Sequence, residues 1–226
     1  MGSGRQLSAV LDRLLSPVLI VCAIVMTVLA ARRELAPSRS ASSRPAMPTA
    51  YIIGRLAPSM PRSAGGRIVG ESAAPVRVLE FADFQCPFCA RAAEELAKLA
   101  ADNPRQIAVE FHHAVIPGHP FARLAAEAAE CAADQDRFTE MYHLIFENGH
   151  RLGSWSWREF GRRAGVKDLV AFDRCVQEHK FSARIDADIE LAGKLGVRGT
   201  PTWLVHDSLF GGLPPVAQLR EWVLRD

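Results

Sequence analysis

Two cysteines separated by two residues, in the sequence Cys-Pro-Phe-Cys at 86–89, are the group in this chain whose chemistry can be inferred most directly. The residues before them, 76–82, are largely β-branched and aromatic and predict a buried strand. The residues after them predict an amphipathic helix with Cys86 at its start and Cys89 on the apolar face. This asymmetry suits dithiol–disulfide exchange, in which an exposed, ionised sulfur attacks and a sheltered sulfur resolves the mixed disulfide.

The expected position of Cys86 explains why its thiol would ionise easily. Unpaired N–H groups and the dipole at a helix N-terminus favour negative charge, so a thiol there can have a pKa of roughly 3.5–7.5 instead of about 8.5. Pro87 suits the first turn because its φ is already helical. The alternatives are a zinc site and two inert packed thiols. Zinc needs four ligands, but the sequence has no second CxxC, and His112 and His113 are adjacent, so no metal is expected.

Composition indicates one ordinary domain with a targeting segment. The chain has 226 residues, of which 49% are hydrophobic, and a formal net charge of +2, which gives no sign of nucleic-acid binding. The sequence contains no evident cofactor-binding motif. Cys22 lies in an apolar N-terminal run, and the four remaining cysteines, an even number, are compatible with an oxidising compartment.

The N-terminal region predicts a membrane anchor. After a short tail at 1–13, residues 14–31 carry no charge and are just long enough to span a bilayer as a helix. The alternative is a secretory signal cleaved near residue 30. More arginines follow the span than precede it, which favours a cytoplasmic C-terminal domain, whereas a dithiol oxidant works outside the cytosol. We follow the chemistry and expect a single-pass protein of the bacterial inner membrane with its domain in the periplasm.

A spacer and a single folded domain are expected after the anchor. Residues 32–66 are rich in Pro and Ser, which predicts a disordered spacer of roughly 30 Å or more. Tyr51-Ile52-Ile53 is an apolar island within it. Residues 67–226 predict a folded domain with a second strand at 106–111 and a helical stretch at about 119–195. They end in a strand at 202–205 and a closing helix at 214–226.

Thr200-Pro201, at the head of the last predicted strand, forms the second informative motif. A cis peptide there would expose neighbouring backbone to an extended substrate, and the alternative is an ordinary trans turn. Together, residues 80–89, 128–131, 172–175 and 199–202 resemble the DsbA-like thioredoxin-fold oxidoreductases. The resemblance implies an α/β thioredoxin fold (βαβ–ββα) with an inserted helical domain. It also implies a cis Thr200–Pro201 bond packed against the dithiol.

The resemblance, read with the residues, assigns individual roles. Cys86 is the expected nucleophile and Cys89 the resolving thiol, which together form the redox-active disulfide. Pro87 and Phe88 would tune the redox potential, and because Phe88 cannot stabilise a thiolate as a histidine does, we expect a disulfide less oxidising than DsbA's, roughly −120 mV. Thr200 and Pro201 would contact the sulfurs and the substrate.

Three further predictions concern residues around this group. Glu80 would relay a proton to or from Cys89, unless it is a partly solvated edge residue. Cys131 and Cys175 are either a structural disulfide, as in some members of that family, or two buried thiols. Phe84 is expected to pack below the site, and His112, His113 and His119 flank a loop after the second strand, as scaffold or rim residues.

The resemblance implies periplasmic thiol–disulfide exchange with cysteine-containing exported proteins. A membrane redox partner, either a quinone-linked oxidase or a donor of reducing equivalents, would reset the site. The alternatives are a reductase or isomerase that is kept reduced, and a chaperone or assembly factor that uses the fold only for binding. The sequence leaves open the direction of exchange, the substrates and the oligomeric state.

Overall fold

The computed structural model of the chain describes residues 26, 51–55, 65–103, 105–212 and 220–221. The chain divides into two units, 1–46 and 47–226, and of the first only Met26, which is helical and exposed, is described. Most of the predicted anchor at 14–31 and of the predicted closing helix at 214–226 therefore lies outside the described residues, although Arg220 and Glu221 are helical. No helix in the described part of the chain has the length and hydropathy needed to cross a membrane.

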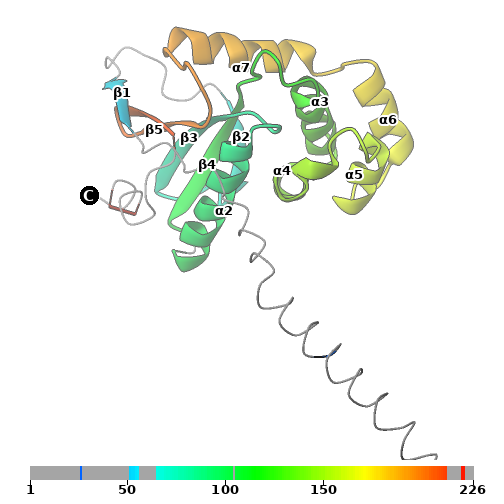
Figure 1. Cartoon of the computed structure of the whole chain (residues 1–226), viewed down its shortest axis with the longest axis horizontal. Helices are drawn as coiled ribbons and strands as arrows, with labels where there is room; N and C mark the ends of the chain where they lie inside the picture. The colour runs from blue at the N-terminus through cyan, green and yellow to red at the C-terminus, as the bar shows by residue number, and fades with distance from the viewer. Residues whose placement is uncertain (1–25, 27–50, 56–64, 104, 213–219, 222–226) are drawn as a thin grey trace, which may run out of the picture. The chain divides into compact units, whose positions relative to one another are not determined.

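A six-stranded mixed sheet forms the centre of the second unit (Figure 1). Its strands lie in the order β1-β6-β5-β3-β4-β2, with β3 and β4 parallel and the other neighbours antiparallel. The strands are β1 (Tyr51–Arg55), β2 (Arg67–Gly70), β3 (Val76–Ala82), β4 (Ile107–His113), β5 (Thr202–Val205) and β6 (Ser208–Gly211).

Helices connect the two halves of this sheet. Helix α2 (Pro87–Asp102) joins the parallel strands β3 and β4. The segments between β4 and β5 are α3 (Ala122–Ala133), α4 (Phe138–Glu147), the 3₁₀ turn η1 (Gly149–Arg151), α5 (Trp157–Arg163), α6 (Leu169–Gln177) and α7 (Ser182–Lys194). In Figure 1, α3 to α6 gather to one side of the sheet, beyond β4 and β2. The predicted fold class, a thioredoxin fold with an inserted helical region, is confirmed.

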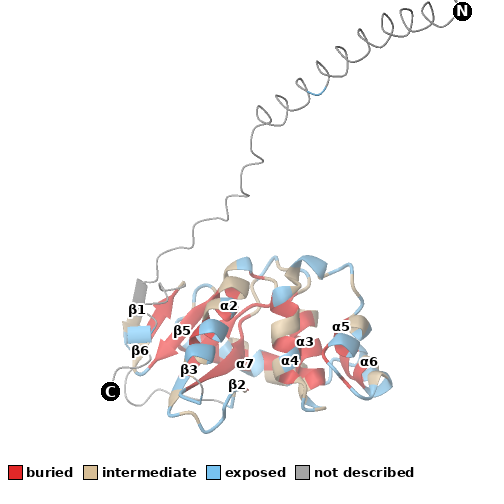
Figure 2. Cartoon of the chain, turned by 90° about the horizontal axis from the view of Figure 1, so that it is seen from below, coloured by how far each residue is buried: buried red, intermediate tan, exposed pale blue. Residues whose placement is uncertain are grey.

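Strand β3 is buried on both faces because helices cover the sheet on each side (Figure 2). Val78 and Ala82 belong to a core shared with Cys89 and other α2 residues, whereas Leu79 and Phe81 belong to a second core shared with α7. Successive residues of a strand point to opposite faces. Glu80 therefore points to the same face as Val78 and Ala82, beneath α2.

Two sequence-based expectations need correction. Tyr51–Arg55 is not part of a disordered spacer but forms edge strand β1, paired antiparallel with β6. The second strand extends beyond the predicted 106–111, so that His112 and His113 end β4 and are buried, which agrees with the scaffold alternative. Ser156 caps α5, since its hydroxyl accepts the Glu159 N–H.

Candidate active site

The two cysteines lie at the start of α2, where β3 ends. Cys86 is the N-cap residue in an extended conformation, and Pro87 begins the helix. The Cys86 N–H donates to the carbonyl of Asp83 at 3.0 Å, which fixes the turn before the helix. Cys86 is 4% exposed and Cys89 is 0% exposed. The outer cysteine is thus more sheltered than the sequence suggested.

The environments of the two thiols favour opposite charge states. A hydrogen bond from the Cys89 thiol is the largest cause that lowers the pKa of Cys86 to about 6, and contacts with Thr200 and the N–H groups of Phe88 and Cys89 add to it against the opposing effect of burial. Burial, followed by the neighbouring Cys86 sulfur, holds the pKa of Cys89 well above its ordinary value. At neutral pH the Cys86 sulfur is therefore largely a thiolate while Cys89 keeps its proton.

The loop before β5 closes over the Cys86 sulfur. The Thr200–Pro201 peptide bond is cis. The Thr200 carbonyl oxygen lies 3.6 Å from Cys86 Sγ. The Thr202 hydroxyl donates to the Gly199 carbonyl at 2.7 Å and the Gly212 N–H donates to the Pro201 carbonyl at 2.9 Å, so this loop is fixed from both sides.

Glu80 is a fully buried carboxyl group on the sheet beneath α2. Strand β3 lies between β5 and β4, which excludes the alternative of a solvated edge residue. The Tyr142 hydroxyl donates to Glu80 Oε2 at 2.8 Å, and Glu80 Oε1 has no hydrogen-bond partner among the described residues. Burial raises the pKa of Glu80 to about 8, although the Tyr142 hydrogen bond lowers it. A carboxyl group of this kind can exchange a proton near neutral pH.

Tyr142 is the hydrogen-bond partner of this carboxyl group, a contact the sequence did not indicate. Burial, followed by the charge of Glu80 and a weaker effect of Cys89, raises the pKa of Tyr142 well above its ordinary value. Phe84 packs against Tyr142, Phe111 and Phe146, so it lies in the core under the site as expected.

Asp83 and Gln85, which the sequence analysis did not select, fix the active-site loop to the loop after β4. The buried Asp83 carboxylate accepts the N–H groups of Gln85 at 2.7 Å and Ile116 at 2.8 Å, and lies 3.0 Å from His119 Nδ1. Gln85 Oε1 accepts the Phe121 N–H at 2.7 Å. The sequence signal that could have selected Asp83 is its position between the predicted strand and the CxxC motif. His119 therefore belongs to the rim of the site.

His112 and His113 belong to a buried charged network away from the cysteines. His112 Nδ1 lies 2.8 Å from Asp188 Oδ1, and its Nε2 lies 3.3 Å from Glu110 Oε1. His113 Nε2 lies 3.0 Å from Glu130 Oε1. Despite its burial, the pKa of Glu130 is lowered to about 2 by His113, Arg67 and Arg184. These groups connect β4 to α3 and α7 and support the fold rather than the reaction.

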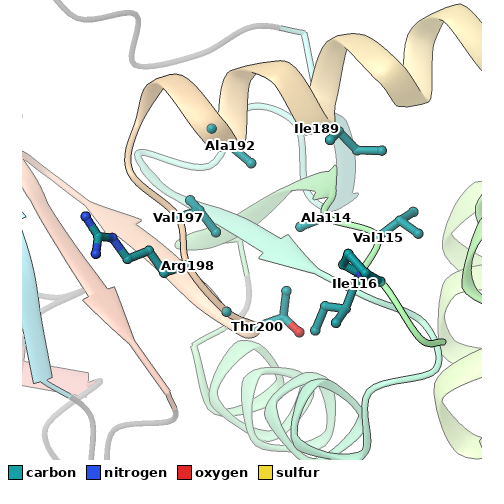
Figure 3. Close-up of a pocket in the computed structure, with 11 residues that line it drawn as sticks. Ala114, Val115, Ile116, Ile189, Ala192, Val197, Arg198 and Thr200 are labelled. Atoms are coloured by element: carbon teal, nitrogen blue, oxygen red, sulfur yellow. The ribbon is translucent and has the colours of Figure 1, made fainter.

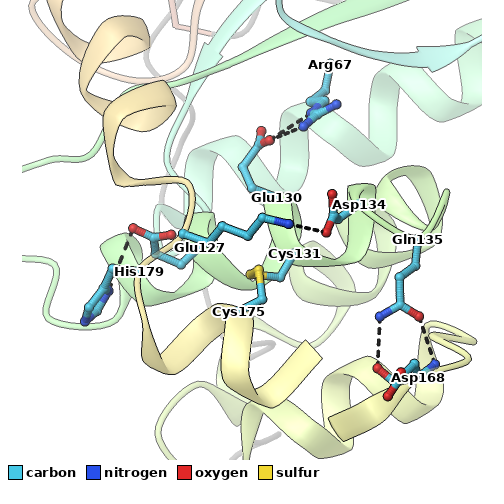
Figure 4. Close-up of a disulfide and its surroundings, with 10 residues drawn as sticks. Arg67, Glu127, Glu130, Cys131, Asp134, Gln135, Asp168, Cys175 and His179 are labelled. Carbon is cyan, nitrogen blue, oxygen red and sulfur yellow. Dashed lines mark hydrogen bonds and ion pairs between the residues drawn. A yellow bond between two sulfur atoms is a disulfide. The ribbon is translucent and has the colours of Figure 1, made fainter. Parts of the chain in front are cut away.

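Cys131 and Cys175 are joined by a disulfide with an S–S distance of 1.95 Å (Figure 4). The sequence was compatible with either a disulfide or two free thiols at these positions, and the structure contains the disulfide. The bridge connects α3 with α6, both in the inserted region, and both sulfurs are buried. Cys86 and Cys89 are the two free cysteines within the described residues.

The site combines an acidic thiol with a buried neighbouring thiol that keeps its proton, and both lie on a sheet of this topology. These features define the thioredoxin-fold thiol–disulfide oxidoreductases. The chain belongs to the thioredoxin family: the family model described as "Thioredoxin" matches residues 62–224.

Solved structures with similar folds include DsbA-like proteins. A thioredoxin-like oxidoreductase from Silicibacter pomeroyi has a TM-score of 0.60 at 26% identity, and the match covers 71% of this chain and 91% of that protein's chain. The thiol–disulfide exchange protein alpha-DsbA2 from Wolbachia pipientis has a TM-score of 0.59 at 24% identity, covering 69% and 84%. BdbD from Bacillus subtilis has a TM-score of 0.60 at 22% identity, covering 77% and 94%. The similarity to the last two structures is evidence for a shared fold.

The curated relatives are much longer proteins. The Na(+)/H(+) antiporter NhaA 3 of Salinispora tropica is 35% identical over 137 residues, which are 61% of this chain and 21% of that protein. NhaA 1 of Salinispora arenicola is 34% identical over 137 residues, with the same coverage. The matched region spans about a fifth of each of these relatives.

Proposed function

We propose that this protein exchanges disulfides with cysteine-containing exported proteins through Cys86 and Cys89. The observation that carries the proposal is the opposite effect of the fold on the two thiols, which lowers the pKa of Cys86 to about 6 and raises that of Cys89. An acidic thiol is a good leaving group, and a proton-holding neighbour is a poor competitor for a mixed disulfide.

In the oxidised form, the cycle begins when a substrate thiolate attacks Cys86 Sγ. A bond forms between the substrate sulfur and Cys86, the Cys86–Cys89 bond breaks, and Cys89 leaves as a thiolate that takes up a proton. Glu80, with a pKa near 8, is the proposed proton donor in this step, through the buried region it shares with Tyr142. A second substrate thiolate then attacks the substrate sulfur and expels the Cys86 thiolate. Two substrate thiols are oxidised and one protein disulfide is reduced.

Thr200 and Pro201 are proposed to bind the substrate backbone next to Cys86. The Thr200 carbonyl lies 3.6 Å from Cys86 Sγ, so any chain joined to that sulfur must pass it. Pro87 and Phe88 complete the surface around the sulfur as residues of the first helical turn.

The setting of this reaction is proposed from the sequence and from the family. We propose a single-pass protein of the bacterial inner membrane, anchored through residues 14–31, whose domain lies outside the cytoplasm. The Cys131–Cys175 disulfide supports an oxidising compartment, because such bonds rarely persist in a reducing cytosol. A membrane redox partner, a quinone-linked oxidase or a donor of reducing equivalents, would regenerate the site.

Substitution of each active-site cysteine in the full chain tests the proposal. Cys89→Ser is expected to accumulate mixed disulfides with disulfide-bonded exported proteins, because Cys86 attacks the substrate disulfide, one substrate sulfur leaves as a thiolate, and no Cys89 thiol follows to release the adduct. Cys86→Ser is expected to accumulate none and to lose turnover of a dithiol peptide. Non-reducing gels and peptide mass measurement provide the readout. Equal trapping by both variants would show that the roles are wrong. Full activity in a cell when both cysteines are replaced would establish the chaperone alternative instead.

The steady-state redox form of the pair distinguishes the two directions of exchange. Mostly oxidised Cys86–Cys89 in cells supports an oxidase, and mostly reduced supports a reductase or isomerase, because the partner and compartment set the direction.

A further inference from the structure

A pocket of about 310 Å³ opens beside the cis-proline loop (Figure 3). Its walls come from three segments: the residues after β4, the C-terminal half of α7, and the residues that precede Pro201. Aliphatic side chains dominate them, and those labelled in Figure 3 include Val115, Ile116, Ile189, Ala192 and Val197. Water in such a pocket is readily displaced by an apolar group.

Thr200 belongs both to this pocket and to the reaction centre. It lines the pocket, and its carbonyl oxygen lies 3.6 Å from Cys86 Sγ. Its hydroxyl oxygen is buried and has no hydrogen-bond partner among the described residues. An extended chain advances about 3.3 Å per residue. A polypeptide joined to Cys86 through its own cysteine therefore places a residue one or two positions away at the pocket mouth.

We propose that this pocket is a specificity site that takes a branched aliphatic side chain, Val, Ile or Leu, located within two residues of the reacting cysteine of a substrate. The inference rests on the proposed disulfide exchange and adds the class of substrate. The walls have few charges to pair with a polar side chain. Arg198, the charged residue of the lining, is exposed, and in Figure 3 its side chain points away from the aliphatic ones. A charged residue in the pocket would therefore lose its hydration without gaining a buried partner.

The test compares oxidation of reduced peptides by the oxidised full chain. Each peptide carries two cysteines, and one flanking position at a time, from two before to two after the first cysteine, is Leu, Ala or Asp. A reduced small dithiol without side chains serves as the reference substrate. At the position that meets the pocket, kcat/KM is expected to be about tenfold or more higher for Leu than for Asp, since apolar pockets discriminate groups of this size by such factors.

Gly193 offers a way to fill the pocket without a clash. It lines the pocket on α7, and a Cβ added there has nothing within 4 Å. Gly193→Leu is expected to reduce the Leu-over-Asp ratio at least threefold. Lys194→Leu is the matched control: it adds the same side chain one position along the helix, outside the pocket lining, and is expected to leave the ratio unchanged. Thermal unfolding checks that both variants fold.

Each outcome decides the inference. Equal kcat/KM for Leu, Ala and Asp at every position, with turnover of the small dithiol intact, overturns the specificity site but leaves the proposed exchange standing. A preference for Leu that Gly193→Leu and Lys194→Leu reduce equally, or not at all, places the preference outside this pocket and also overturns it. Loss of turnover with the small dithiol and with every peptide overturns both.

Discussion

The charge on one sulfur governs the proposed chemistry, and the titration of Cys86 follows from its contacts. The hydrogen bond from the Cys89 thiol and the contacts of the helix start stabilise the thiolate and set its pKa at about 6. Ultraviolet absorbance of the reduced protein should rise by one thiolate with a midpoint near pH 6, and Cys86→Ser should remove that rise. A midpoint at or above the ordinary thiol value of about 8.5 would contradict the assignment.

The redox potential follows from the same stabilisation. The more strongly a fold stabilises the thiolate, the more oxidising its disulfide becomes, and DsbA reaches roughly −120 mV with a thiol pKa near 3.5. Cys86, at about 6, is less stabilised. Equilibration with glutathione should therefore give a potential below that of DsbA. Phe88→His should raise the potential and lower the Cys86 pKa, because an imidazole can donate to the sulfur where a phenyl ring cannot. A potential at or above −120 mV would refute this.

Glu80 should reduce stability at neutral pH while it serves the reaction. Its pKa is about 8 in the folded protein against 4.5 as an ordinary glutamate, so the folded state holds a proton that the unfolded state loses. Stability from this group therefore falls as pH rises from about 4.5 to 8.

Glu80→Gln should thus be more stable at pH 7 by roughly 1–3 kcal/mol, with no gain at pH 4. The same variant in its oxidised form should form mixed disulfides with a substrate thiol at least tenfold more slowly, since general acid–base catalysis contributes about 10²-fold or more. Urea unfolding at the two pH values and single-turnover kinetics measure these effects. Unchanged kinetics would remove Glu80 from the mechanism.

At the scale of the elements, one aspartate fixes α7 to the sheet. Asp188 accepts the His113 N–H at 3.0 Å and lies 2.8 Å from His112 Nδ1. Burial opposes a charge on His112, but hydrogen bonds to Asp188 and Glu110 raise its pKa overall. The stability that this pair contributes is complete below the unfolded pKa of 6.5 and is lost as pH rises through the higher folded value.

Asp188→Asn should cost about 3 kcal/mol at pH 6, because it removes the nearer of the two carboxylates that face the buried His112. It should also reduce the loss of stability above pH 6.5. The control is Asp186→Asn on the same helix, whose partner Arg123 lies at the surface; its cost should stay below about 1 kcal/mol. Urea titrations across pH 6–9 compare the two, and equal costs would show that the buried network contributes little.

The disulfide between α3 and α6 should stabilise the inserted region without taking part in exchange. Its cysteines are 44 residues apart, and closing a loop of that size contributes about 4 kcal/mol. The double variant Cys131→Ala/Cys175→Ala should therefore melt roughly 8–16 °C lower. Its oxidation of a dithiol peptide at 25 °C should match that of the unmodified chain. Loss of exchange in a variant that is still folded would give this bridge a redox role.

At the scale of the whole molecule, local signals were sufficient where an element and its chemistry adjoin in sequence. The strand before Cys86 was predicted at 76–82, where β3 lies, and the start of α2 at Cys86 followed from the proline and the apolar spacing. The inserted helices were visible as 3.6-residue periodicity, and the bounds of the helical stretch were close to those observed.

Features that depend on distant partners could not be predicted. Strand β1 pairs with β6, more than 150 residues away, and its five residues lie among prolines and serines that indicate disorder. The burial of His112 depends on Asp188 of α7, and the environment of Glu80 depends on Tyr142 of α4. The sequence does not specify where α7 and α4 lie relative to β3 and β4. Cys86 was expected to be exposed because nothing in the tetrapeptide reports the cover provided by Thr200.

The sheltering of the reactive sulfur also bears on survival under oxidative stress. Peroxide converts a thiolate first to a sulfenic acid, which is reversible, and then to sulfinic and sulfonic acids, which a thiol does not reduce. Cys86 is 4% exposed and hydrogen-bonded to the Cys89 thiol. A sulfenic acid formed on Cys86 would lie beside the Cys89 thiol, and condensation of the two would release water and give the Cys86–Cys89 disulfide. The partner that protonates Cys89 in exchange would then also limit further oxidation of Cys86.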